Sequence, residues 1–187
     1  MAAMRETGLV MLTTLGFACL ASCGGGGPGP TTSSGELQIA AQCQANSAQD
    51  QTRSAFRVID TSDHPIDLGD VTVRYYFSHM ITTGAEPMMM VDYIEKGVLT
   101  DVYAVFSDAY VDIKFVATAG QLAPSDPAGG GQLQIHLFAS DFSNWDVSLA
   151  DDYSYVACTA GTPAPDYVPR PTMTGYVGGK LAWGVEP

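Results

Sequence analysis

The strict alternation of apolar and polar residues over 70–78 constrains the fold of this chain more than any other feature. In this stretch, which reads DVTVRYYFS, the side chains of Val71, Val73, Tyr75 and Phe77 share one parity. Successive side chains of a β-strand point to opposite faces, whereas those of a helix repeat about every 3.6 residues. The stretch therefore predicts a β-strand with one buried face.

Eight further segments are short and rich in residues that favour β-strands, and none shows a helical period. Turns are frequent, because the chain has 20 glycines, 11 prolines and only 15% charged residues, and we predict one over 61–69. Gly178 and Gly179 predict a tight hairpin turn between the last two segments. We therefore expect an all-β domain, a β-sandwich of jelly-roll type with about nine strands. The eight segments are residues 36–43, 54–60, 88–93, 102–106, 110–116, 133–138, 174–177 and 180–183.

The N-terminus has the pattern of an export signal. Residues 9–20 form an apolar run that is shorter than the roughly 20 residues needed to span a bilayer, as in the core of a signal peptide. The letters LASC over 20–23 then resemble the lipobox of bacterial lipoproteins, which implies that Cys23 is lipidated. We expect a signal peptide over 1–22 and a lipid anchor in the bacterial envelope, at the outer membrane, with the domain outside the cytoplasm. The alternative is ordinary secretion with Cys23 as a free thiol.

Residues 23–35 are predicted to be a tether between this anchor and the domain. The letters GGGGPGPTTSSG over 24–35 offer nothing to pack into a core, and a flexible chain of that length reaches on the order of 20 Å. The folded domain is therefore expected over 36–187.

The four cysteines predict one disulfide bond. Cys19 is removed with the signal peptide and Cys23 is taken by the lipid, which leaves Cys43 and Cys158 in an oxidising compartment. Cys43 also has the parity of the inward-facing residues of its predicted strand. We predict that Cys43 and Cys158 pair, and two buried free thiols are the alternative.

Charge and motifs exclude several classes of function. The net charge is −12, whereas binding to nucleic acid or anionic lipid depends on Lys and Arg. The sequence has no nucleophile elbow and no HExxH motif, and His64, His79 and His136 lack metal-ligand spacing. We therefore predict a protein that is neither an enzyme nor a nucleic-acid binder.

The stretch 134–155 combines a strand, exposed aromatic residues and an acidic turn. Gln134 and His136 alternate with apolar residues and are predicted to point outward. Phe142 and Trp145 follow among Ser, Asn and Asp, a composition typical of a surface loop. Such rings either bind a ligand or anchor the loop while half-buried.

Three pieces of the chain resemble family 3 carbohydrate-binding modules, the cellulose-binding type found on cellulases and cellulosome scaffolds. They are residues 66–77, the run SDFSNW over 140–145 that leads to DYSY over 152–155, and the terminal GKLAWGVEP over 179–187. Their order and spacing fit the family from residue 37 to 187. The resemblance implies a nine-stranded jelly roll.

Members of that family bind crystalline cellulose with a flat strip of side chains. Apolar C–H faces of glucose stack on aromatic rings, and polar groups bind the hydroxyls around the edge. This chain has His136 where Arg is usual, Phe142 where Trp is usual and Tyr93 where His is common, and the loop between Lys96 and Asp101 is short. The strip that the resemblance implies consists of Asp92, Tyr93, Gln134, His136, Phe142 and Trp145.

The family also has a structural calcium ion near the DYS motif. The resemblance places Asp152, Asp151 and Asp146 as candidate ligands, since Ca²⁺ prefers carboxylate oxygens. The acidic ligand expected after the YYF strand is replaced by Ser78-His79-Met80. A solvated acidic loop without calcium is the alternative.

We thus expect a non-catalytic, lipid-anchored module that binds cellulose or a related β-glucan and works beside glycoside hydrolases. The alternative is an envelope lipoprotein that uses the same sandwich for protein contacts without binding a glycan. Exposure of Tyr93, Phe142 and His136 in one plane would favour the first hypothesis, and burial of those rings the second.

Overall fold

The computed structural model describes residues 33–44, 51–78, 85–124, 131–143, 151–158 and 166–187, all within the unit Thr31–Pro187. The predicted signal peptide, Cys23, the tether as far as residue 32, Trp145 and Asp146 lie outside these residues. Within the described ranges, we find no helix with the length and apolar character to cross a membrane.

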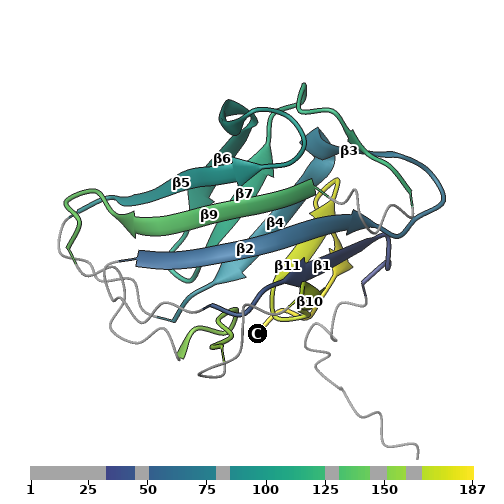
Figure 1. Ribbon diagram of the computed structural model, residues 1–187. Coiled ribbons are helices and arrows are strands. Elements are labelled where there is room, and N and C mark those ends of the chain that lie inside the picture. Colours follow the sequence, from purple (N-terminus) through teal and green to yellow (C-terminus); the bar gives the residue numbers. More distant parts are fainter. Residues whose placement is uncertain (1–32, 45–50, 79–84, 125–130, 144–150, 159–165) are drawn as a thin grey trace, which may run out of the picture. The chain divides into compact units, whose positions relative to one another are not determined.

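Two antiparallel five-stranded sheets form a sandwich, and Figure 1 shows them as stacked layers. The first sheet has the order β10 (Val168–Pro169), β1 (Leu37–Ala41), β2 (Gln51–Asp60), β9 (Gly131–Ala139) and β5 (Pro87–Ile94). The second has the order β12 (Lys180–Trp183), β11 (Thr174–Val177), β4 (Val71–Tyr76), β7 (Tyr110–Phe115) and β6 (Val102–Phe106). A small separate sheet pairs β3 (Ile66–Asp67) with β8 (Gln121–Leu122).

The alternation within the strands decides which side chains fill the core. Val71, Val73 and Tyr75 of β4 are at most 1% exposed, as the alternation predicts. Phe56 and Val58 of β2 are fully buried in the same core cluster. Burial of each such side chain contributes roughly 1.5–3 kcal/mol, so the two apolar faces hold the sheets together.

Connections that cross between the sheets give the sandwich its jelly-roll character. The chain passes from β2 in the first sheet to β4 in the second, returns to β5, and crosses again to β6. Strand β9 then lies between β2 and β5, which are far from it in sequence. The predicted fold class is therefore confirmed.

All nine predicted strands are present, but the sequence analysis missed three. These are β3, β8 and β10, each only two residues long. The predicted turn over 61–69 in fact contains β3 and the start of the 3-10 turn η1 (Leu68–Asp70). A two-residue strand is too short to show a period, and its pairing depends on partners far away in the chain.

The hairpin of β11 and β12 has the predicted bounds. Val177 pairs with Lys180, and Gly178 and Gly179 between them have φ angles of 54° and 77°. Two consecutive residues with positive φ are what a primed two-residue turn requires, and glycine adopts this conformation without steric cost.

Cys43 and Cys158 form the predicted disulfide bond, with Cα atoms 4.9 Å apart and a sequence separation of 115. The neighbouring Gln44 and Ala157 form an isolated parallel bridge. Cys43 is only half-buried, contrary to the inward position that its parity predicts, because β1 ends at Ala41. The bond thus lies beyond the end of the strand.

Candidate functional site

The outer face of the first sheet brings together most of the predicted strip residues. Across β5 and β9, Tyr93 is paired with Gln134 and Met90 with His136. Directly opposite side chains of an antiparallel pair lie about 4.5–5.5 Å apart at Cβ, so these residues form one continuous surface.

A β-bulge in β5 explains why both Asp92 and Tyr93 are exposed. The register of β5 against β9 shifts between Val91 and Tyr93, so that Tyr93, rather than Asp92, is paired with Gln134. Without an extra residue, neighbours in a strand would point to opposite faces. The bulge leaves Asp92 beside the strip and Tyr93 on it, with Tyr93 44% exposed.

Asp92 and His136 form a hydrogen-bonded pair on this face. The carboxylate Oδ2 of Asp92 lies 2.9 Å from Nδ1 of His136. The imidazole ring also lies 5.2 Å from the ring of Phe138, centroid to centroid, and its side chain is only 15% exposed. The ring is therefore held between a carboxylate and a phenyl group, and little of it is open to solvent.

Phe142 lies in a tight turn directly after β9. Its backbone has a φ of 57°, its amide donates to the carbonyl of Ala139 at 2.8 Å, and its side chain is 74% exposed. The ring is stacked on Phe138, with centroids 5.3 Å apart and an interplanar angle of 12°. A large ring with one face supported by protein and the other in water is suited to stacking on an apolar sugar face.

Several neighbours of the strip were not predicted as site residues. Met88 and Met90 of β5 are about half exposed, and Phe138 supports Phe142 from below. Phe138 has the parity of Gln134 and His136, and Met88 and Met90 alternate with Met89, so the strand pattern alone would place them on the same face. Nothing in the sequence indicates Tyr167, whose ring lies over the guanidinium of Arg57 at 4.5 Å.

The predicted metal ligands are only partly described. Asp151 is exposed, and Asp152 is buried with Oδ1 accepting a hydrogen bond from the Ser78 amide at 2.8 Å. The described residues contain no group of three His, Cys, Asp or Glu side chains that could hold a metal ion. They therefore do not make a calcium site by themselves, and Asp152 joins the acidic segment to the end of β4.

The outer face of the second sheet differs, since Tyr110 and Tyr176 are engaged with other side chains there and Tyr103 of β6 is its exposed ring. The Arg74 guanidinium donates to both carboxylate oxygens of Asp112, at 2.7 and 3.2 Å. It also lies over the rings of Tyr110 and Tyr176, and the Tyr176 hydroxyl donates to Glu186 at 2.6 Å. This cluster stabilises the sheet rather than presenting free ring faces.

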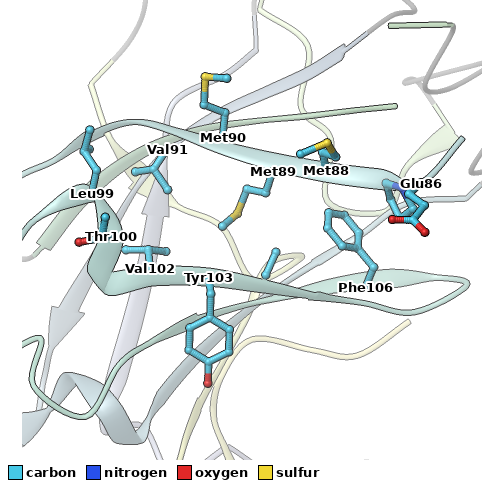
Figure 2. A pocket seen from close by; sticks show the side chains of 12 residues that line it. Glu86, Met88, Met89, Met90, Val91, Leu99, Thr100, Val102, Tyr103 and Phe106 are labelled. Atoms are coloured by element: carbon cyan, nitrogen blue, oxygen red, sulfur yellow. The ribbon is translucent and has the colours of Figure 1, made fainter. Parts of the chain in front are cut away.

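A groove of about 590 Å³ lies between the edge strands β5 and β6. Figure 2 shows Met89 and Val91 turned toward β6, and Met90 turned away from it. Of the described residues that line the groove, Glu86 alone is charged. Glycoside hydrolysis needs a pair of carboxyl groups, and the described lining of this groove does not provide one.

The chain is similar in sequence to proteins of known family. The chain matches the family described as "Cellulose binding domain" over residues 38–184. Endoglucanase 5 of Pectobacterium carotovorum subsp. carotovorum is 34% identical over 150 residues, which are 76% of this chain. This region is only 28% of that enzyme, so the chain spans less than a third of its length.

Solved structures show the same fold. A biomass-sensing module from putative RsgI-like proteins of Clostridium thermocellum has a TM-score of 0.66 and 28% identity, and the match covers 82% of this chain and 99% of that one. The CBM3a-L domain of the scaffoldin CipA of the same organism has a TM-score of 0.66 and 25% identity, and the match covers 84% and 94%. The chain therefore belongs to the cellulose binding domain family, and its β-sandwich is a non-catalytic family 3 carbohydrate-binding module.

Proposed function

We propose that this protein binds cellulose or a related β-glucan through the outer face of the first sheet. The observation that carries the proposal is the exposed ring of Phe142, stacked on Phe138 and followed along the sheet by His136 and Tyr93. On this face the exposed rings stand beside the polar groups of Asp92 and Gln134.

The arrangement matches the chemistry of a glucan chain. Glucose rings in β-linkage present apolar C–H faces, which gain contact with Phe142 and Tyr93 while water is released. Gln134 and Asp92 lie beside these rings and can bind the equatorial hydroxyls. A phenyl ring offers less stacking area than an indole, so binding is weaker than that of a strip built on Trp.

Retention on microcrystalline cellulose tests the proposal. The full chain carrying Cys23→Ser, which prevents lipidation, is compared with the same chain carrying Phe142→Ala in addition. Tyr103→Ala is the control, because Tyr103 is an exposed ring, 46% accessible, on β6 in the other sheet. We expect the parent and Tyr103→Ala to be retained equally and Phe142→Ala to be largely lost.

We further propose that the module is exported and anchored to the bacterial envelope by a lipid on Cys23. The LASC motif over 20–23 is the basis, and the bond between Cys43 and Cys158 supports an oxidising compartment. Labelling cells with a fatty-acid analogue tests this, since the parent should be labelled and Cys23→Ser should not. An unlabelled parent would contradict the anchor.

The anchored module would hold a cell, or glycoside hydrolases at its surface, against plant-type β-glucan. The relative that is named an endoglucanase supports such an association. If the folded parent is retained neither by cellulose nor by other β-glucans, the protein-contact hypothesis replaces this one.

A further inference from the structure

A second aromatic platform lies on the same sheet face as Phe142, in a part of the chain that the strip does not include. Tyr167 directly precedes β10, the strand at the opposite edge of the sheet from β5. Its ring lies over the guanidinium of Arg57, 4.5 Å from Cζ to the ring centroid. Tyr167 is half-buried, as expected for a ring with one face covered.

Arg57 belongs to the outward-facing row of β2. It alternates with the fully buried Phe56 and Val58, and its register partner on β9 is Gln132. Its Nε is covered from solvent, which fits a guanidinium beneath the tyrosine ring. A planar guanidinium stacks well on an aromatic face, so Arg57 supports Tyr167 as Phe138 supports Phe142.

The register places Tyr167 next to the proposed strip. Tyr93, Gln134 and Ala55 form one row across β5, β9 and β2. In the adjacent row the Glu95 amide donates to the Gln132 carbonyl, opposite Arg57. Strands lie about 4.8 Å apart, so β2 is about 10 Å from β5, and a ring over Arg57 lies near Tyr93.

The electrostatics of Tyr167 agree with this position. Burial raises the pKa of its hydroxyl, the Arg57 guanidinium lowers it, and the nearby Glu95 carboxylate and Tyr93 hydroxyl raise it further. Tyr167 is thus close enough to interact electrostatically with Arg57 on β2 and with Tyr93 and Glu95 at the end of β5. It does so although it precedes a strand at the opposite edge of the sheet.

We infer that Tyr167, supported by Arg57, is a second sugar-stacking subsite, so that the binding face extends from Phe142 across Tyr93 and Gln134 to Tyr167. Phe138 and Gln132 mark the two ends on β9, six residues apart, which is about 20 Å of strand. A ligand must then be a glucan long enough to contact rings at both ends. This inference rests on the proposed function and deepens it.

Affinity for cellulose and for oligosaccharides of different length tests the subsite. Binding isotherms on microcrystalline cellulose and calorimetry with cellohexaose and cellobiose are measured for the parent, Tyr167→Ala, Tyr167→Phe and the control Tyr103→Ala. We expect Tyr167→Ala to weaken binding to cellulose and cellohexaose by about tenfold, equivalent to about 1.4 kcal/mol. Tyr167→Phe keeps the ring and should match the parent, and any binding to cellobiose, which is too short to reach both rings, should be unchanged.

Other outcomes separate this inference from the proposed function. Loss of binding in Phe142→Ala together with parent-like binding in Tyr167→Ala overturns the subsite and leaves the strip intact. A folded parent that binds none of the probes overturns both. Tyr167→Trp covers the case in which Tyr167→Ala does not fold, because a larger ring at a true subsite tightens binding, and unchanged affinity overturns the inference.

Discussion

The exposed ring of Phe142 is stacked on the buried ring of Phe138, with centroids 5.3 Å apart and planes inclined by 12°. Phe138 is only 5% exposed, so it is fixed by the sheet and in turn fixes Phe142. The φ of 57° at Phe142 lies in the left-handed region, which residues with a side chain seldom adopt. The ring of Phe142 is therefore stacked on Phe138 by a turn whose backbone conformation is unfavourable.

Replacing Phe142 by glycine should separate backbone strain from ligand binding. A left-handed conformation costs a residue with a Cβ about 1 kcal/mol, and glycine avoids this cost. We expect Phe142→Gly to be about 1 kcal/mol more stable than Phe142→Ala in urea unfolding. Both should lose retention on cellulose to the same degree, because both lack the ring. Equal stability of the two variants would show that the turn is not strained.

Removing the disulfide bond should destabilise the domain. The bond between Cys43 and Cys158 closes a long loop, and loss of such a bond commonly costs about 2–4 kcal/mol. We expect the double variant Cys43→Ser with Cys158→Ser to unfold at a lower urea concentration than the parent. Reductant should lower the urea midpoint of the parent to that of the variant and leave the midpoint of the variant unchanged. A parent insensitive to reductant, with the bond demonstrably broken, would contradict this.

Calcium remains a prediction that thermal unfolding can test. If Asp146, Asp151 and Asp152 bind Ca²⁺, a hundredfold excess over the dissociation constant stabilises the folded state by about 2.7 kcal/mol. The unfolding midpoint should then rise with calcium chloride, fall with a chelator and respond little to magnesium. Asp146→Asn with Asp151→Asn should remove the response while keeping the contact between Asp152 and Ser78. Identical midpoints with calcium and chelator would favour the solvated loop.

Stability at alkaline pH should depend on Tyr176. Burial, followed by the hydrogen bond to Glu186, raises the pKa of this hydroxyl far above its usual value of about 10. The unfolded chain releases the proton at about pH 10 and the folded chain only at higher pH, so this stabilisation is complete below pH 10 and is lost above it.

Urea unfolding between neutral pH and pH 11 tests whether stability falls as the pH rises above 10. The free energy of unfolding should fall by about 1.4 kcal/mol per pH unit above pH 10 for this one proton. The decline should be shallower in Tyr176→Phe than in the parent, because the variant lacks this proton. A steeper decline in Tyr176→Phe would contradict the assignment.

The local pattern was sufficient to predict the strands that are long enough to show it. The bounds of β6, β11 and β12 agree with the prediction, and the positive φ at Gly178 and Gly179 follows from the turn that joins the last two strands. Side-chain parity also placed Gln134 and His136 on the outer face of β9. These features depend on residues next to one another, so no knowledge of distant contacts was needed.

Tertiary structure decided which of these residues share a surface. The bulge that exposes both Asp92 and Tyr93 depends on the register of β5 against β9, and the support of Phe142 depends on a turn with positive φ. Tyr167 reaches Arg57 across 110 residues of sequence. The sequence alone determined an all-β sandwich with a disulfide bond. The alternation of a strand is a local pattern, and the pairing follows from the number of cysteines that remain in the exported chain. Only the packed sheets determined the extent of the binding face, because it is built from pairs that meet after the two layers have formed.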